Sequence, residues 1–154
     1  MVKIITYDKK YKDDFIRLNT EWISHYFRIE ESDLETFAHV DDIISDGGQI
    51  FLALLDNEVV GCCALKHHTD TNSYELSKMA VSPHHQGQHI GHQLGNALID
   101  YATTHGVSEI FLEGNRRLAP SIALYRSLGF EEVPLQGQAY ERCDILMKKF
   151  IAPK

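Results

Sequence analysis

The amino-acid sequence predicts a mixed α/β (α+β) fold, in which helices cover both faces of a mostly antiparallel central sheet. Runs rich in apolar and β-branched residues have the length and composition of strands, and they lie at about 2–6, 50–55, 59–65, 74–81, 109–113, 130–133 and 143–150. Other segments repeat apolar residues every three or four positions, as amphipathic helices do, at about 11–26, 32–46, 90–105 and 119–128. The polar residues 56–58 join two strands as a tight antiparallel hairpin.

The N-terminal part is expected to hold one strand and two helices. Asp8 can cap the first helix because its carboxylate accepts hydrogen bonds from free backbone N–H groups. The apolar positions of that helix are Tyr11, Phe15, Leu18, Trp22 and Tyr26. A second short helix begins at Ser32 or Asp33, and the glycines at 47 and 48 end it. Its expected buried residues are Leu34, Phe37, Ala38 and Ile44.

Length and composition indicate one soluble domain spanning residues 1–154. The formal net charge of −7 argues against nucleic acid as a partner, because such proteins usually carry a basic face. No apolar run is long enough to cross a membrane, and none follows a basic N-terminal region as a signal peptide would. We therefore expect a cytoplasmic protein. The last strand, 143–150, could pair across a dimer if its edge is exposed, so both a monomer and a homodimer are open.

Cysteine usage agrees with a reducing compartment. The chain has three cysteines, and two of them, Cys62 and Cys63, are adjacent. An odd number of cysteines with this spacing does not form a disulfide framework. On a strand their side chains point to opposite faces, where we expect them to be small buried hydrophobic residues.

The most informative stretch is the turn that follows the strand 74–81. Pro83 ends that strand because proline lacks the N–H that a ladder requires. A glycine-bearing turn follows, and from Ile90 onward the apolar residues take helical spacing. A strand end, a glycine turn and a helix start together present unpaired N–H groups and the positive end of a helix dipole. This combination predicts a site for a phosphate or pyrophosphate.

Three sequence features together resemble the GNAT-type N-acetyltransferases. They are the run Gln86-Gly87-Gln88-His89-Ile90-Gly91, Asn115 after the next strand, and Leu124-Tyr125-Arg126-Ser127-Leu128-Gly129-Phe130. That family binds acetyl-CoA at a Gln/Arg-x-x-Gly-x-Gly/Ala turn and often carries a Leu-Tyr-x-x-x-Gly-Phe segment. The resemblance covers the chain from residue 50 onward and implies the GNAT fold, acetyl-CoA as cosubstrate, and direct acetyl transfer to a primary amine of a small molecule or peptide.

The resemblance also implies a cofactor site. Backbone groups of Met79, Ala80 and Val81 would pair with the pantetheine arm like a further strand, although core packing alone explains the side chains of Met79 and Val81. The pyrophosphate would be held by the N–H groups of Gln86, Gly87, Gln88, His89, Ile90 and Gly91. Asn115 would bond the cofactor arm or order a water, and its alternative is a loop asparagine.

His89 departs from the family motif, which has glycine at this position. We expect a helix start there with φ near −60°, from which a histidine still offers its N–H. Its side chain would crowd the pyrophosphate unless it turns outward. This departure keeps an alternative open, a CoA-binding regulatory module with weak or lost turnover. The turn also lacks lysine and arginine, so the nearby sources of positive charge are His84, His85, His89 and His92.

Amide formation needs a base for the acceptor ammonium and an acid for the departing CoA thiolate. By the resemblance, Glu75 is the base, directly or through a water, because some family members place a glutamate four residues before Met79. Its alternative is a glutamate paired with Lys78 or solvated. Tyr125 corresponds to the family's acid, and its alternative is aromatic packing on a helix face. Cys143 is expected on the last strand, away from the turn, so nothing suggests a covalent intermediate.

The acceptor site is expected between the first two helices and a late loop. Its candidate residues are Tyr26, Phe27, Arg28, Tyr74 and Tyr140. An acidic protein suits a cationic amine, whereas Arg28 could hold a carboxylate. Scattered surface charge explains the acidity equally well.

Nine histidines raise the possibility of a metal site. Zinc requires three or four ligands that converge, commonly at fixed spacings with cysteines or carboxylates. The clustered histidines straddle a turn and a helix beside the expected phosphate site. We therefore expect no physiological metal.

Overall fold

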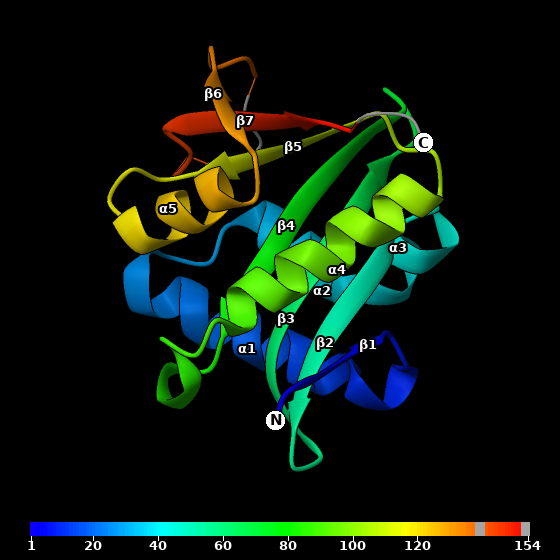
Figure 1. Cartoon of the computed structure of the whole chain (residues 1–154), viewed down its shortest axis with the longest axis vertical. Coiled ribbons are helices and arrows are strands. Elements are labelled where there is room, and N and C mark those ends of the chain that lie inside the picture. The colour runs from blue at the N-terminus through cyan, green and yellow to red at the C-terminus, as the bar shows by residue number, and fades with distance from the viewer. Residues whose placement is uncertain (138–140, 152–154) are drawn as a thin grey trace.

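The protein, described here by a computed structural model, has a seven-stranded sheet with helices on both faces (Figure 1). The structure describes residues 1–137 and 141–151. The strands are β1 (Lys3–Thr6), β2 (Gln49–Leu55), β3 (Glu58–His68), β4 (Ser73–Val81), β5 (Glu109–Gly114), β6 (Glu131–Val133) and β7 (Ile145–Phe150). The helices are α1 (Lys12–Tyr26), α2 (Glu31–Ala38), α3 (Val40–Ser45), α4 (Ile90–Thr104) and α5 (Ala119–Ser127). No helix among these residues is long and apolar enough to cross a membrane.

The sheet is mixed and mostly antiparallel, as predicted. Its strand order is β1-β2-β3-β4-β5-β7-β6, and only the pair β4 and β5 is parallel among the described strands. The last strand, β7, has β5 on one side and β6 on the other. The expectation of an exposed last strand is therefore wrong, since the short β6 returns beside β7 and covers it.

Two short-range predictions are confirmed. Asp8 accepts a hydrogen bond from the Lys10 N–H at 3.0 Å and caps the 3-10 turn (Lys9–Tyr11) that leads into α1. Asp56 and Asn57 connect β2 to β3 with positive φ angles of 51° and 65°. A two-residue hairpin turn with both φ angles positive matches the right-handed twist of its strands, and Asp and Asn tolerate it.

Each face of the sheet has its own hydrophobic core. On the face covered by α4 and α5, Leu94 and Leu98 pack with β-strand residues, and Leu128, which directly follows α5, joins them. On the other face, α1 and α3 bury residues that include Phe15 and Val40. Cys62 belongs to one core and Cys63 to the other, and both are free and buried, as expected for adjacent strand residues.

The sheet opens between β4 and β5. These parallel strands pair only at Tyr74 with Ile110 and at Glu75 with Phe111, and they diverge beyond that point (Figure 1). On the other side of β4, a bulge disturbs the register with β3 where Lys78 has a φ of 57°. Positive φ at a non-glycine residue is strained and tends to occur at functional sites. The wedge between the two strands is therefore a candidate functional site.

The region 32–46 differs from the single helix predicted there. It forms two helices, α2 and α3, which meet at His39, and the side that α2 buries is polar. Asp33 and Thr36 are buried in α2, whereas Leu34 is 59% exposed. The expected burial of Leu34 and Ala38 is wrong, because the buried face of α2 meets charged groups instead of the apolar core.

Those charged groups form a buried network around Asp33. The Lys78 ammonium lies 2.5 Å from Asp33 Oδ1, and the Arg142 guanidinium donates to both Asp33 oxygens at 2.8 and 2.9 Å. Arg142 also donates to Glu30 at 2.8 Å. Burial alone would raise the pKa of Asp33, but the bonds from Arg142 and Lys78 outweigh it and hold this pKa at about 2. The network ties α2 to the bulge of β4 and to the segment before β7.

Replacing Asp33 with asparagine keeps the shape of the side chain and removes its charge. We expect Asp33→Asn to lower the free energy of unfolding at pH 7 by about 3 kcal/mol, because two buried cations lose their carboxylate. A carboxylate with a depressed pKa stabilises the folded protein above its unfolded pKa of about 3.9. That contribution is lost between about pH 4 and pH 2 in the wild type and is absent in the variant.

Denaturant unfolding at pH 7 and across pH 2–4 measures both effects. Asp100→Asn, which changes an exposed carboxylate on α4, is the control and should leave stability nearly unchanged. Equal stability of Asp33→Asn and wild type at pH 7 would contradict a structural role for the network.

Candidate active site

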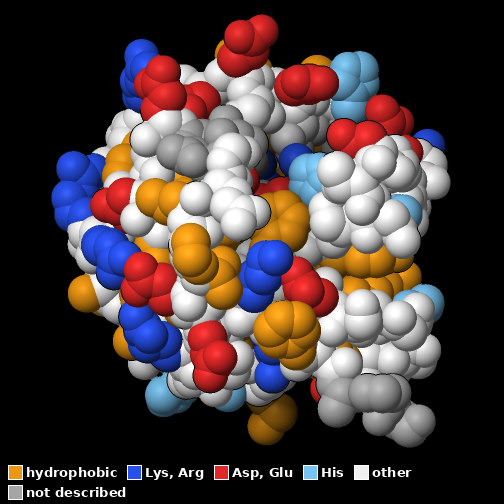
Figure 2. Space-filling view, turned by 90° about the horizontal axis from the view of Figure 1, so that it is seen from above, with side chains coloured by type: hydrophobic (Ala, Val, Ile, Leu, Met, Phe, Trp, Pro, Cys, Tyr) orange, Lys and Arg blue, Asp and Glu red, His pale blue; other side chains and the backbone are white. Residues whose placement is uncertain are grey.

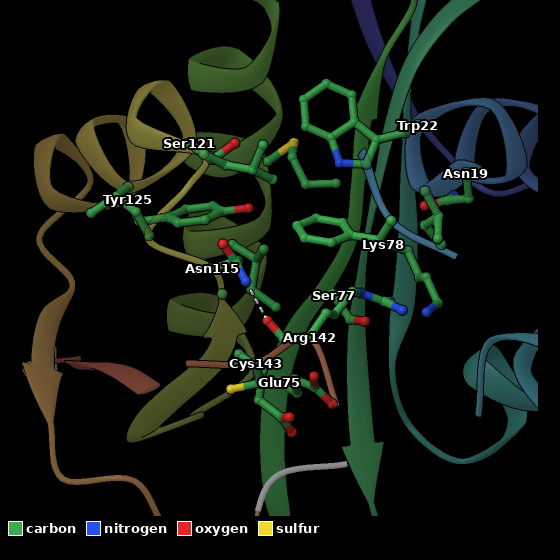
Figure 3. A pocket seen from close by; sticks show the side chains of 18 residues that line it. Asn19, Trp22, Glu75, Ser77, Lys78, Asn115, Ser121, Tyr125, Arg142 and Cys143 are labelled. Atoms are coloured by element: carbon green, nitrogen blue, oxygen red, sulfur yellow. Dashed lines mark hydrogen bonds between the residues drawn. The ribbon is translucent and has the colours of Figure 1, made fainter. Parts of the chain in front are cut away.

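A cavity of about 100 Å³ occupies the wedge between β4 and β5 (Figure 3). We call it the wedge cavity. It is lined by Asn19, Trp22, Ile23, Phe27, Glu75, Leu76, Ser77, Lys78, Met79, Glu113, Gly114, Asn115, Leu118, Ser121, Ile122, Tyr125, Arg142 and Cys143. In Figure 3, Trp22 and Tyr125 approach it from opposite sides, one from α1 and the other from α5.

A second hollow of about 440 Å³ lies between the turn after β4 and helix α5. We call it the turn groove. Its lining includes residues 79–81, 85–87 and 89–92, and on the α5 side Pro120, Ser121, Ala123, Leu124 and Ser127. Trp22, Met79 and Ser121 line both the groove and the wedge cavity. The two hollows therefore adjoin and share these three residues in their walls.

The turn itself carries two left-handed residues, Gly87 with a φ of 80° and His89 with a φ of 60°. The expected φ near −60° at His89 is wrong. His89 precedes the first helical residue of α4 and has the backbone conformation that glycine favours, and its side chain is exposed. The backbone of the turn thus takes a glycine-like path although a histidine occupies the position.

The turn groove brings together eight of the ten residues predicted for cofactor binding. They are Met79, Ala80, Val81, Gln86, Gly87, His89, Ile90 and Gly91. Gln88 is exposed and lies outside the lining of both hollows. His85 and His92 also line the groove, beside the N-terminus of α4, where free N–H groups and the helix dipole favour an anion.

Asn115 lines the wedge cavity instead of the groove. Its amide donates to the Arg142 carbonyl at 2.7 Å, and its side-chain oxygen accepts from the Arg117 N–H at 2.8 Å. Both ends of the amide are therefore engaged with backbone groups. This arrangement matches the loop asparagine that the sequence left as an alternative.

Glu75 is almost fully buried, with 3% of the residue exposed, and it lines the wedge cavity. Its Oε1 lies 2.8 Å from Nε2 of His68 on the adjacent strand β3. It is therefore not solvated, and the ion pair of Lys78 is with Asp33. A buried carboxylate beside a cavity is a candidate proton acceptor.

A second carboxylate in the wedge cavity, Glu113, was missed by the sequence analysis. It follows the apolar residues 110–112 near the end of β5, and a charged residue ending an apolar strand is the signal that could have found it. Cys143 also lines the cavity, although we expected it on the last strand and away from the turn. Burial and the neighbouring charge of Glu113 raise the pKa of the Cys143 thiol to about 11.

Tyr125 projects from α5, and its hydroxyl points into the wedge cavity (Figure 3). Burial raises the pKa of Tyr125 above its usual value, which keeps the phenol protonated. The ring packs edge-on against Phe130 with centroids 6.3 Å apart. Packing therefore fixes the ring while the hydroxyl remains available to the cavity.

Of the residues predicted to bind the acceptor, Phe27 lines the wedge cavity. Tyr26 lies beside Trp22, with ring centroids 4.8 Å apart, outside that lining. Arg28 is exposed and pairs with Glu141. Tyr74 points to the opposite face of the sheet from Glu75 and stacks on His67. Tyr140 lies outside the described residues.

A family model supports the chemistry that these features suggest. The model described as "Acetyltransferase (GNAT) family" matches residues 16–130, which include most of α1 and all elements from α2 to α5. The chain belongs to the GNAT acetyltransferase family.

Solved GNAT structures agree with this assignment. One from Staphylococcus aureus has a TM-score of 0.86 at 21% identity and covers 97% of this chain and 99% of its own. A GNAT phosphinothricin acetyltransferase from Sinorhizobium meliloti, solved in complex with acetyl-CoA, has a TM-score of 0.81 at 20% identity and covers 97% and 88%. The predictions of a GNAT fold, an acetyltransferase and acetyl-CoA as its cosubstrate are confirmed at the level of the family.

Curated relatives match part of this GNAT chain. Human N-acetylaspartate synthetase is 32% identical over 87 residues, which are 56% of this chain and 29% of the human protein. The [ribosomal protein bS18]-alanine N-acetyltransferase of Escherichia coli is 39% identical over 69 residues, which are 45% of this chain and 47% of the relative. The match therefore spans less than half the length of either relative.

The left-handed backbone at His89 generates a prediction about stability. Side chains with a Cβ disfavour this conformation by about 1–2 kcal/mol, which outweighs the flexibility that glycine adds to the unfolded chain. We expect His89→Gly to be about 0.5–1 kcal/mol more stable than His89→Ala, because both variants lose the imidazole and only one keeps a Cβ.

Paired variants in the middle of α4 provide the control for thermal or denaturant unfolding. At the exposed Asn96 the order should reverse, with Asn96→Ala about 1 kcal/mol more stable than Asn96→Gly. If His89→Ala is at least as stable as His89→Gly, the turn does not hold this residue in a left-handed conformation.

Proposed function

We propose that this GNAT protein transfers the acetyl group of acetyl-CoA to a primary amine of a small molecule or peptide by direct attack. The observation that carries the proposal is that the turn groove and the wedge cavity adjoin at Trp22, Met79 and Ser121, which line both. Acetyl-CoA lying in the groove, with its pyrophosphate at the start of α4, would direct its thioester into a cavity that offers carboxylates and a phenol.

The pantetheine arm would lie along β4. After the divergence of β4 from β5, the edge of β4 around Met79 has no neighbouring strand among the described residues, while Ala80 and Val81 pair with β3 on the other side. An extended amide chain can add to such an edge through backbone hydrogen bonds.

In the reaction, the amine nitrogen attacks the thioester carbonyl carbon, so that a C–N bond forms and the C–S bond breaks. The acceptor first loses a proton to Glu75, or to a water that Glu75 orients, and Glu113 is a second carboxylate within the same cavity. The departing CoA sulfur receives a proton from the Tyr125 hydroxyl, which its raised pKa keeps in the protonated form. The nitrogen gives up its second proton as the amide forms, and this proton returns to the Tyr125 oxygen, so the phenol is regenerated and the protons balance.

The Cys143 thiol is protonated at neutral pH, and this favours direct attack of the amine over a covalent acyl-enzyme. The thiolate is the nucleophilic form of cysteine, and a pKa of about 11 leaves very little of it at neutral pH. Cys143 can pack beside the acceptor without competing for the acetyl group.

The names of the two curated relatives support an acceptor that presents the amine of an amino acid or of a peptide. One is named for N-acetylaspartate and the other for alanine in a ribosomal protein. The small volume of the wedge cavity fits the amine end of such a molecule, with the remainder outside. The buried Glu75 would favour a cationic amine over a neutral alcohol.

A thiol-release assay with acetyl-CoA tests the proposal against a panel of amino acids, peptide N-termini, polyamines and aminoglycosides. Calorimetry measures acetyl-CoA binding alongside. We expect binding together with turnover on amino acids or peptides. Binding without turnover on any amine supports the alternative of a CoA-binding regulatory module, and the absence of binding rejects both functions.

The acid role of Tyr125 is tested by Tyr125→Phe. We expect kcat to fall about 100-fold or more while the KM for acetyl-CoA stays unchanged, because only the departing thiolate loses its donor. Tyr101→Phe, on the core side of α4 where its ring stacks on His105, is the matched control and should keep full activity. An unchanged kcat in Tyr125→Phe, with chemistry rate-limiting, removes Tyr125 from the mechanism.

A further inference from the structure

We propose that His68 is a positioning residue for Glu75, whose hydrogen bond fixes the carboxylate in an orientation toward the acceptor amine. The inference rests on the proposed function and adds a residue that neither the family motif nor the turn points to. The inference is based on the contact between the partly exposed imidazole of His68 and the buried carboxylate of Glu75, which lines the wedge cavity.

The contact between His68 and Glu75 has defined geometry. His68 Nε2 lies 2.8 Å from Glu75 Oε1, and the side chains are 35% and 4% exposed. Because an ionised carboxylate only accepts hydrogen bonds, Nε2 must carry the proton. Glu75 Oε2 has no hydrogen-bond partner within residues 1–137 and 141–151, so it is the oxygen left for a ligand of the wedge cavity.

Strand register and ring packing hold His68 in place. Glu75 faces Lys66 across the β3–β4 ladder, and His68 lies two residues further along β3 on the same face. The imidazole also packs near the ring of Phe111, with centroids 5.7 Å apart. Phe111 is the β5 partner of Glu75, so three neighbouring strands fix the contact.

The other charged groups around Glu75 have hydrogen-bond partners of their own, and Lys78 also attracts the Glu75 carboxylate through its charge. On β3, the Lys66 ammonium donates to the Thr36 hydroxyl at 3.2 Å, and on β4, Lys78 binds Asp33 of α2. Arg142 binds Asp33 and Glu30, and Glu113 on β5 lies next to Cys143. The described hydrogen bond to the Glu75 carboxylate comes from His68.

Glu75 also lines a hollow of about 430 Å³ on the other side of the contact, between β3 and the helices α2 and α3. His67, His68 and Lys66 line it as well. Figure 2 looks onto this end of the molecule and shows basic, acidic and histidine side chains around a cleft near its middle. His68 thus stands between the solvent and a carboxylate whose other side faces the wedge cavity.

This arrangement has a consequence for catalysis. A hydrogen bond from the His68 N–H to one carboxylate oxygen of Glu75 fixes the direction in which the other oxygen faces the acceptor. Without this bond, we expect the base to act from a less fixed orientation. Hydrogen bonds to charged groups of this kind correspond to about 10- to 100-fold in rate.

The experiment compares kcat and KM for the amine at pH 7 in wild type, His68→Ala and His68→Gln. We expect His68→Ala to lower kcat/KM for the amine about 10- to 100-fold, mainly through kcat. The KM for acetyl-CoA should not change. His68→Gln should recover most of the activity because its amide N–H replaces the donor, and His67→Ala on the opposite face is the control.

Several outcomes would overturn the inference. They are a kcat/KM of His68→Ala that equals that of the wild type, or equal losses in the alanine and glutamine variants. Full activity in Glu75→Gln would also overturn it while leaving the proposed function standing. A wild type that binds acetyl-CoA but acetylates no amine rejects the proposed function, and the catalytic role of the pair with it. A double-mutant cycle of His68→Ala and Glu75→Gln in thermal unfolding detects the contact without relying on activity.

Discussion

The separation of β4 from β5 is the constraint on which the rest of the structure depends. Two parallel strands that remained paired along their length would leave neither a free strand edge nor a space between them. Pairing ends after Glu75 and Phe111, so the following residues of β4 face a hollow instead of a neighbour. The turn groove, the wedge cavity and the pairing surface for an extended cofactor arm all follow from this one break in the ladder.

Opening a sheet in its middle exposes polar backbone groups, so the separated strands must be held by contacts from outside the sheet. In this protein a network of ion pairs provides those contacts. Asp33 joins the bulge residue Lys78 to Arg142, which precedes β7, and thereby ties together three segments that the divergence would otherwise leave apart. Such a buried network stabilises only when every member is paired, which gives α2 its polar inner face and fixes the geometry of the acceptor side.

Sequence patterns predicted those parts of the fold that local physics determines. The hairpin at Asp56 and Asn57, the strand ending before Pro83 and the helix from Ile90 follow from turn chemistry and periodicity. The face of α2 was misjudged because periodicity assumes an apolar interior, whereas Asp33 is buried by charges distant in sequence. The contacts of Cys143 and His68 could not be predicted because no local pattern reports which strands will diverge, whereas Glu113 carries one local signal, a charge at the end of an apolar strand.

Cys143 shows how the same surroundings shape the chemical resistance of the site. Electrophiles and peroxides attack the thiolate, and the raised pKa of this thiol keeps it in the unreactive form at neutral pH. A cysteine that lines the wedge cavity is therefore a poor target for oxidants and for thiol-directed covalent inhibitors at neutral pH.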